Sequence, residues 1–421
     1  SEPGRREALL AVLLIWSVVP AIGAVPFVVT GGMSPLNALF ESMSAFTTTG
    51  ATVLSDFGAF TSSLFMWRAA AQWIGGIGII VIFVSLFPRL AIAGRQLFFT
   101  EAPGPTDERL TPKLRHTATT LLTVYGGLTV ACALAYWAAG MTLTQAVSHS
   151  FSTLSAGGFS SEAASFAGFE SRAVEWVGSV FMFLAGVNFA LQYRVYTRRP
   201  RALLADVEFR AYLLTVLAAS IAVAYFLWDG GGIGEAMRTG IFQVVSILTT
   251  TGYASTDFAV WGPPAQIVLV ALMFVGGSAG SAAGGVKVVR WLIVLRQSSG
   301  EVRRALHPRA VLPVRLGSQI VPDAVVRSVA AFITLYVLVF ACSTAVLAML
   351  GTDLVTSFSA AIACLGNIGP GLADVGPMES FADLPALGRA VLTFDMYAGR
   401  LEVVTVFAVL TRDWWRVPPP R

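Results

Sequence analysis

Eight apolar runs dominate the chain, and each is long enough to cross the hydrocarbon core of a bilayer as a helix, which takes about 20 residues. They cover residues 8–30, 63–87, 117–139, 172–197, 211–228, 263–297, 324–350 and 386–411. Only 12% of the residues are charged and 55% are hydrophobic, whereas soluble domains carry about 25% charged residues. The sequence therefore predicts an all-α membrane protein whose surroundings are the lipid bilayer.

A shorter, mixed segment lies between the two runs of each successive pair. These segments are residues 34–57, 141–162, 234–257 and 352–374, and each is a modest apolar stretch followed by a polar loop with glycine. Each is too short to cross the membrane twice as helices, but it suits a half-helix that enters, turns and returns as extended chain. Such irregular backbone occurs at membrane depth only where it lines a water-filled cavity or is buried in protein.

The polar loops of these four segments can be aligned with one another. They read "SAFTTTGAT", "FSTLSAGGFS", "SILTTTGYAS" and "ACLGNIGPGL". Chance similarity could explain one pair, but it does not readily explain four loops that each lie between two spans. We therefore expect four tandem helix–pore loop–helix repeats around a central pore, as in a K⁺ channel. The expected boundaries of the repeats are 1–90, 91–200, 201–300 and 301–421.

Charge predicts the orientation in the membrane. The basic residues gather in residues 89–115, 198–210, 296–315 and 412–421, which the positive-inside rule assigns to the cytoplasm together with both ends of the chain. The flanks of the pore loops carry acidic residues, and although solvated loop charge would explain most of them singly, together they would attract cations to an outer mouth. They are Asp56, Glu162, Glu170, Asp229, Asp257, Asp353, Asp374 and Asp383. Because the basic residues lie in loops between apolar spans, the net charge of +4 indicates no nucleic acid partner.

Four such loops around one axis can present rings of backbone carbonyls, which replace the water around a dehydrated alkali cation. Aiming successive carbonyls inward needs backbone angles that glycine adopts at little steric cost. Each loop has a suitable glycine, although Gly157 leaves the register of the second loop uncertain by one. We expect Thr48, Thr49, Ser155, Thr250 and Thr251 to brace the loops from behind. The candidate filter, which would bind K⁺ through its carbonyls, is Thr48, Thr49, Gly50, Ser155, Ala156, Gly157, Gly158, Thr250, Thr251, Gly252, Asn367, Ile368 and Gly369.

A glycine-rich stretch, "GGSAGSAAGGVK", interrupts the sixth run (263–297). Each glycine destabilises a helix interior by roughly 1 kcal/mol relative to alanine, and the run is too long for one straight crossing. We expect a broken helix whose two halves are joined by a flexible loop that gates the pore below the filter. Close helix packing by small residues is the alternative, and a phosphate-binding loop is excluded because no GK[ST] follows. The candidate gate residues are Gly276, Gly277, Ser278, Ala279, Gly280, Ser281, Gly284, Gly285, Lys287 and Arg400.

Arg400 lies inside the last apolar run, where an arginine costs roughly 2.5–3.5 kcal/mol on insertion scales. It should therefore face a water-filled pore or a partner. Glu402 is close in sequence, but side chains two positions apart on a helix point away from each other. An ion pair that ties Arg400 to the glycine-rich stretch is the alternative to a role in the pore.

Other functional classes find little support in the sequence. The three cysteines and three histidines form no metal-ligand spacing, and no nucleophile–base constellation indicates an enzyme. No nucleotide-binding motif is present, so we expect no organic cofactor in this chain, only the transported ion. Uptake coupled to H⁺ or Na⁺ stays open, because Glu41, Glu175, Asp395 and Glu402 are acids near the spans. A role as the ion-selecting subunit of a pump also stays open.

Several motifs along the whole chain resemble those of one transporter family. They are "GRREALL", "FTTTGA", "WRAAAQWIGGIGIIV", "STLSAGGFS", "ILTTTGY", "GGSAGSAAGGVKVVR", "GNIGPG" and "AGRLE". The sequence resembles the TrkH/KtrB/HKT superfamily of potassium transporters, and its TrkH branch most closely. "AGRLE" and "WIGGIG" favour this family over a KdpA-like pump subunit. The pair of N-terminal spans that usually precedes the first repeat of TrkH-type chains does not appear here, so either this sequence is trimmed or it is closer to the shorter relatives.

The resemblance implies a potassium uptake protein of the bacterial inner membrane with one pore per protomer. It implies that Gly50 goes with K⁺ rather than Na⁺, that the glycine-rich stretch is an intramembrane gate, and that Arg400 lines the path below the filter as a barrier to cations. It also implies a homodimer and a cytosolic TrkA-like regulatory subunit, which binds NAD(H) or ATP and docks on the arginine-rich face.

Overall fold

The computed structural model describes residues 5–85, 110–197, 201–228, 230 and 232–416, and within these ranges it is almost entirely helical. The prediction of an all-α fold is therefore confirmed. The two strands described, β1 (Arg315–Leu316) and β2 (Gln319–Ile320), form a small antiparallel hairpin outside the helical bundle. The expected repeat boundary at residue 90 lies outside the described residues, as do Asp229 and the basic residues within 86–109, 198–200 and 417–421.

The same order of elements recurs four times along the chain. The first set is α1 (Arg5–Gly23), α2 (Val25–Val29), α3 (Pro35–Phe46), η1 (Phe57–Ala59) and α4 (Ser62–Ser85). The second is α7 (Leu110–Ala138), α8 (Leu143–Leu154), η2 (Ser165–Phe169), α9 (Arg172–Ala185) and α10 (Phe189–Tyr196). The third is α11 (Arg201–Ala205), α12 (Val207–Leu227), α13 (Ile233–Leu248), η3 (Phe258–Val260), α14 (Pro263–Met273) and α15 (Val288–Leu306). The fourth, after the hairpin, is α16 (Asp323–Met349), α17 (Leu354–Leu365), η4 (Ala373–Val375), η5 (Phe381–Asp383), α18 (Ala386–Arg400), α19 (Val403–Leu410) and α20 (Arg412–Arg416).

A short helix stands second or third in each set: α3, α8, α13 and α17. Side chains that accept hydrogen bonds from the first turn start three of these helices, at Ser34, Thr142 and Asp353. Thr142 and Gln145 form a reciprocal capping box. The short helices are largely buried among the long ones, so each is held as a half-helix inside the bundle.

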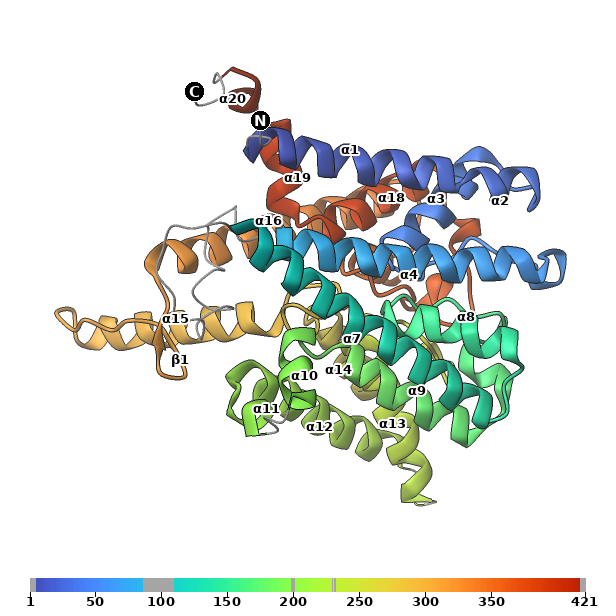
Figure 1. Cartoon of the computed structure of the whole chain (residues 1–421), viewed down its shortest axis with the longest axis horizontal. Coiled ribbons are helices and arrows are strands. Elements are labelled where there is room, and N and C mark those ends of the chain that lie inside the picture. Colours follow the sequence, from blue (N-terminus) through green and yellow to red (C-terminus); the bar gives the residue numbers. More distant parts are fainter. Residues whose placement is uncertain (1–4, 86–109, 198–200, 229, 231, 417–421) are drawn as a thin grey trace.

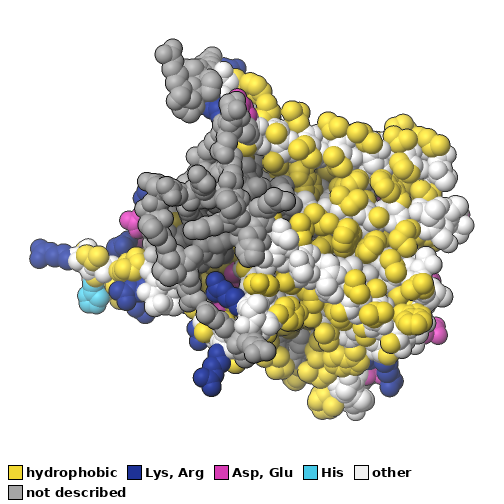
Figure 2. Space-filling model, in the orientation of Figure 1, with side chains coloured by type: hydrophobic (Ala, Val, Ile, Leu, Met, Phe, Trp, Pro, Cys, Tyr) yellow, Lys and Arg dark blue, Asp and Glu magenta, His cyan; other side chains and the backbone are white. Residues whose placement is uncertain are grey.

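Within the described residues, four helical stretches are long and apolar enough to cross a membrane without a sharp bend. They are 6–29, 118–138, 207–227 and 323–349. Their outward side chains are apolar, as at Leu14, Val130 and Leu214, each more than half exposed. Figure 2 shows hydrophobic side chains over much of the side of the bundle, whereas most Lys and Arg seen in this view lie towards the end from which α15 projects.

Three of the second spans are broken. α14 and α15 are separated by residues 274–287, which we call the glycine loop and which contain the stretch singled out in the sequence. α9 and α10 meet at an angle of 102°, and α18 and α19 are separated at Leu401–Glu402. The last two breaks were not predicted. α15 extends well beyond the bundle, at the same end of the molecule where α1 begins and α20 lies (Figure 1).

Candidate ion pathway

One glycine from each of the four loops takes part in a closed ring, and we call Gly50, Gly158, Gly252 and Gly369 the ring glycines. Each faces the carbonyl oxygen of the residue that precedes the ring glycine of the next loop. The pairs, in order, are Gly50 with Gly157, Gly158 with Thr251, Gly252 with Ile368, and Gly369 with Thr49. A Cβ atom would overlap the facing oxygen at the first three positions and would lie 2.8 Å from it at Gly369. The four loops therefore surround one axis in chain order.

The four loops also share their backbone conformation. The residue two places before each ring glycine has a positive φ, although it carries a side chain: Thr48 (+52°), Ala156 (+56°), Thr250 (+58°) and Asn367 (+53°). The ring glycines themselves have φ between +74° and +102°. Left-handed angles are strained for side-chain-bearing residues, so one strained turn is built four times. In the second loop Gly158 rather than Gly157 matches Gly50, which answers the question of register.

The short helices end immediately before these turns, at Phe46, Leu154, Leu248 and Leu365. The C-terminal end of a helix carries a partial negative charge from its unpaired carbonyls. All four ends thus favour a cation at the axis. No carboxylate occurs among the residues predicted to form the filter.

Hydroxyl groups brace the first and third loops in the same way. The Oγ1 atoms of Thr47 and Thr49 lie 2.8 Å apart, and Thr47 also donates to the Met43 carbonyl at 2.6 Å. Thr249 and Thr251 repeat the 2.8 Å contact in the third loop. The sequence analysis named Thr49 and Thr251 but missed Thr47 and Thr249, although aligning the two loops would have revealed the shared pattern.

The other hydroxyl residues named in the sequence analysis take different roles. Ser155 donates to the Ser152 carbonyl at 3.1 Å within its own turn. Thr48 Oγ1 is buried and has no hydrogen-bond partner among the described residues, so Thr48 does not brace its loop. Thr250 Oγ1 instead accepts a hydrogen bond from Gly284 of the glycine loop.

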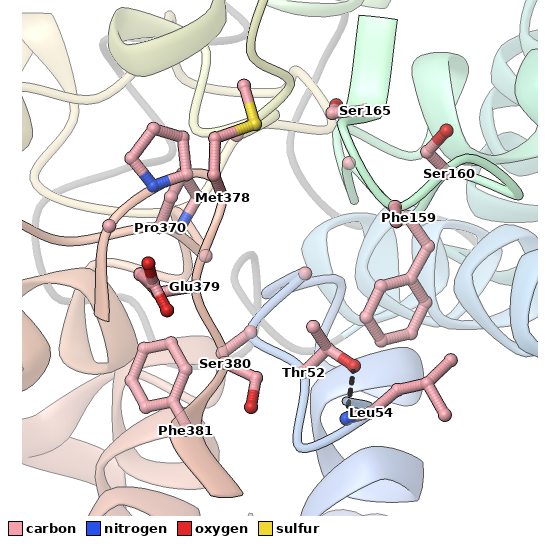
Figure 3. Close-up of a pocket in the computed structure, with 18 of the residues that line it drawn as sticks. Thr52, Leu54, Phe159, Ser160, Ser165, Pro370, Met378, Glu379, Ser380 and Phe381 are labelled. Carbon is pink, nitrogen blue, oxygen red and sulfur yellow. Dashed lines mark hydrogen bonds between the residues drawn. The ribbon is translucent and has the colours of Figure 1, made fainter. Parts of the chain in front are cut away.

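A cavity of about 240 Å³ lies at the ring and is lined by all four ring glycines. Figure 3 shows its wall formed by three of the loop regions, with Thr52 and Leu54 on one, Phe159 and Ser160 on the next, and Met378 to Phe381 on another. Its carboxylates are Glu162, Glu379 and Asp383. Two of these were predicted to flank the mouth, and Glu379 was missed. Three carboxylates therefore give the approach to the ring a negative charge, which would attract cations.

The side chains behind the ring differ from loop to loop. The residue nine places before each ring glycine is Glu41, His149, Gln243 or Ala360, in chain order. In the first three loops this side chain bonds to the segment that leaves the ring, whereas alanine cannot. In the fourth loop Ser359, one place earlier, does so instead, through Leu372 N at 2.9 Å.

Glu41 forms a buried ion pair that joins two loops. Its Oε1 lies 2.7 Å from Arg68 Nη2, and the two side chains are 0% and 2% exposed. Arg68 also donates to the Ser160 carbonyl at 3.3 Å and lies 3.9 Å from the centre of the Phe159 ring. Both residues belong to the second loop, so the first loop is tied to the second by charge.

The tie continues from the second loop to the third. His149 Nε2 lies 3.0 Å from Ser160 Oγ, and its ring stacks on Tyr253. Tyr253 directly follows a ring glycine, and its carbonyl accepts a hydrogen bond from Gln243 at 3.1 Å. A belt of polar side chains thus holds three of the four loops in register from behind.

The glycine loop lies directly below the ring. Gly284 N donates to Thr250 Oγ1 at 2.6 Å, and a Cβ atom on Gly284 would lie 2.7 Å from the Gly366 carbonyl oxygen. Lys287 bonds back to the carbonyls of Ala283 and Gly284, so its ammonium group is satisfied within the loop itself. The glycine loop therefore touches the third of the four loops at Thr250 and the fourth at Gly366.

Glu208, which the sequence analysis missed, holds the glycine loop from the first turn of α12. Its Oε1 accepts hydrogen bonds from Ala279 N at 2.8 Å and from Val289 N at 3.2 Å. One carboxylate therefore binds both the loop and the first turn of α15. No sequence motif marks these contacts, which join residues 71 and 81 positions apart in the chain.

Arg400 is the last residue of α18 and is only 3% exposed. Its Nη1 donates to the Ala282 carbonyl of the glycine loop at 3.1 Å, whereas Nε and Nη2 have no partner among the described residues. Arg400 thus contacts the loop through a hydrogen bond rather than an ion pair. Two of its three guanidinium nitrogens are left for water or another acceptor.

Glu402 is not on a helix, because it lies in the break before α19 with φ at +64°. The expected helical geometry relative to Arg400 therefore does not apply. Its carboxylate binds Arg290 of α15 at 2.6 and 2.7 Å, and Arg290 lies 3.9 Å from the centre of the Phe332 ring. The last span is thus tied to the glycine loop at Ala282 and to the first turn of α15 at Arg290.

Comparisons with known proteins agree on one family. A family model for TrkH, described as a cation transport protein, matches residues 14–413. The Trk system potassium uptake protein TrkH of Halomonas elongata is 39% identical over 99% of this chain and 87% of its own length. The protein of that name from Escherichia coli is 36% identical over the same shares.

A solved structure shares the fold described here. The crystal structure of the potassium transporter TrkH from Vibrio parahaemolyticus matches with a TM-score of 0.89 and 37% identity. The match covers 98% of this chain and 86% of the other. The helical bundle is therefore that of a membrane transport protein.

Proposed function

Because the chain belongs to the TrkH family of cation transport proteins, we propose that it takes up K⁺ through the ring formed by its four loops. The closed order of contacts among the ring glycines is the observation that carries this proposal. A cation that has lost its water needs oxygen atoms on all sides. Four loops in identical strained conformations can supply successive carbonyls around one axis.

The selectivity filter is assigned to the thirteen residues that the sequence analysis named, and the division into four repeats to the boundaries given there. The absence of carboxylates from these loop residues suits carbonyl coordination of a monovalent ion. The acidic cavity outside the ring supports the direction of approach, since it concentrates cations near the filter.

The glycine loop, together with Arg400, is proposed as the gate. Its position against Thr250 and near Gly366 would obstruct an ion that leaves the inner end of the filter. The buried guanidinium of Arg400 beside Ala282 adds a positive charge to this obstruction. Moving the loop and Arg400 aside together would open the path.

Family membership also supports a proposal for the regulatory subunit and for the membrane in which the protein lies. The relatives are components of a Trk system, and we place a cytosolic nucleotide-binding TrkA-like subunit on the arginine-rich arm formed by α15 and the hairpin. This puts both chain ends in the cytoplasm of a bacterium, with the spans in its inner membrane. A homodimer is the expected assembly.

Tracer flux into proteoliposomes tests the filter, with rubidium and sodium compared for the wild type and for Gly50→Ser. We expect rubidium flux driven by its own gradient, and weakened discrimination against sodium in Gly50→Ser because the new side chain would overlap the Gly157 carbonyl. Unaltered discrimination in folded Gly50→Ser would contradict the filter assignment.

Coupled uptake with H⁺ or Na⁺ is the second candidate, and one observation favours it. Asp395 is fully buried, and while one carboxylate oxygen accepts a hydrogen bond from Ser343 at 2.9 Å, the other has no partner among the described residues. Buried acids in membrane proteins often mark ion or proton routes. Rubidium flux that requires a proton or sodium gradient, and loses that requirement in Asp395→Asn, would support coupling.

A further inference from the structure

The break between α9 and α10 exposes backbone groups inside the membrane bundle. α9 ends at Ala185 and α10 begins at Phe189, with an angle of 102° between them. The last carbonyls of a helix have no partner within it, and inside a membrane each must find one. The groups that donate to these carbonyls therefore show which parts of the protein the break contacts.

Side chains of α10 and α12 donate hydrogen bonds to three carbonyls at the break. Tyr212 Oη donates to the Phe183 carbonyl at 3.1 Å. Gln192, which is 5% exposed, donates through Nε2 to the carbonyls of Leu184 at 2.8 Å and Val187 at 3.0 Å. The amide of Gln192 thus spans the break and holds its two sides together.

The glycine loop satisfies the other two. Ala282 N donates to the Ala185 carbonyl at 3.1 Å, and Ser278 N donates to the Gly186 carbonyl at 2.9 Å. In return, Phe189 N donates to the Gly280 carbonyl of the loop at 3.0 Å. Three backbone hydrogen bonds therefore join the broken helix of the second repeat to the loop of the third.

The break also contacts the inner end of the filter. A Cβ atom on Gly186 would lie 2.6 Å from Tyr212 Oη and 2.8 Å from Thr249 Cγ2. Thr249 is the residue that braces the third filter loop through Thr251. The break therefore fits closely between the filter and the glycine loop.

We propose that the α9–α10 break is the seat of the gate, and that Gln192 is a positioning residue that keeps this seat in shape. The proposal rests on the proposed function of the glycine loop. When the loop leaves, the carbonyls of Ala185 and Gly186 lose their partners, and a buried unpaired carbonyl is costly. Opening therefore requires the break to rearrange with the loop. The second span of the first repeat, α4, is one continuous helix and forms no such seat.

Gln192→Leu in the full chain tests the seat, because leucine has a similar size but donates no hydrogen bond. We expect about a five- to tenfold increase in rubidium flux into proteoliposomes, since two hydrogen bonds that hold the closed arrangement are lost. Gln266→Leu is the matched control: Gln266 also donates to two carbonyls, those of Phe258 and Ala259, but at the outer end of α14. Its flux should stay at the wild-type level.

Deletion of Ser278–Ala283 separates the seat from the gate itself. If the deletion by itself increases rubidium flux, the result supports the proposed gate. Gln192→Leu should add nothing in that background, because the loop it positions is absent. An equal increase with and without the loop, or unchanged flux in folded Gln192→Leu, would overturn the seat while leaving the gate standing.

A second readout follows the loop directly. Ser281→Cys places a thiol in the loop, and its rate of modification by a permeant thiol reagent should rise several-fold when Gln192→Leu is added. If Gln192→Leu does not fold, Asn188→Ala replaces it, since Asn188 caps α10 through Ala190 N and Leu191 N. Labelling rates that match Ser281→Cys alone would count against the proposal for either variant.

Discussion

The four loops contribute equally to the ring but unequally to the region beneath it. Around the ring each loop contributes the same parts: a short helix, a left-handed residue and a ring glycine. Below the ring the contributions are unequal, with the glycine loop from the third set of elements, Arg400 from the fourth and the α9–α10 break from the second. The first set contributes a continuous helix, α4.

The roles proposed for the two regions would explain this difference. Selecting a dehydrated cation requires oxygen atoms on all sides, so all four loops must agree. Closing a path requires one obstacle, and one flexible segment supported by its neighbours is enough. In the proposed function, repetition serves selection and departure from repetition serves control. The four predictions below test this contrast, from the largest expected effect to the smallest.

Glu41→Gln tests whether the four similar loops depend on the different side chains that hold them from behind. It removes the charge that pairs with buried Arg68, and breaking a buried pair costs about 3–5 kcal/mol. We expect a large drop in the thermal unfolding temperature of the purified protein in detergent. Gln243→Leu, at the same position of the third loop, removes one neutral hydrogen bond and should destabilise the protein less. Equal losses in the two variants would show that the charge does not matter.

Gly158→Ala and Gly252→Ala test the ring. Their new methyl groups would overlap carbonyl oxygens of the next loop, whereas the methyl group of Gly369→Ala would lie 2.8 Å from one. We expect rubidium flux per folded protein to fall about tenfold in the first two and less in the third. A uniform response of the three variants would contradict the different clearances around the ring.

Deleting Ser278–Ala283 tests whether control belongs to one loop. Rubidium flux should rise several-fold and respond less to the regulatory subunit, because the obstacle below the ring is removed. Adding Gly158→Ala to the deletion is the control, since flux through the ring should then be lost again. Unchanged flux and control in the deletion would remove the gate from this loop.

Arg400→Ala should have the smallest effect on flux, an increase of about twofold to fivefold, because it removes one hydrogen bond to the loop and one buried charge. Arg400→Lys keeps the charge, and its rubidium flux should lie between those of the wild type and Arg400→Ala. The measurement is rubidium flux at matched expression. A flux that stays equal or falls would exclude the barrier.

Local features were predictable from the sequence. Helices follow from apolar length, and the glycine loop follows from a cluster of residues that weaken helices. The turns follow from Gly50 and Gly252, each preceded by three threonines. These features depend on neighbours in the chain, so pattern and propensity are enough to find them.

Features that depend on distant partners were not predictable. The α9–α10 break lies in "LAGVNFA", where a glycine and an asparagine are too common to indicate a 102° bend. Glu402 has a positive φ that glutamate rarely adopts, and Arg290 stabilises it from another helix. The order of the loops around the axis also comes only from packing. In contrast, the series Glu41, His149, Gln243 and Ala360 was within reach of an alignment of the four loops.

That series bears on how such a protein can evolve. In an assembly of four identical subunits, one codon change alters every quarter of the pore at once. Here a codon change alters one quarter, and the other three remain as they were. A glutamate, a histidine, a glutamine and an alanine can therefore occupy corresponding places behind one ring. After gene duplication, each quarter of the pore can change its sequence independently of the other three.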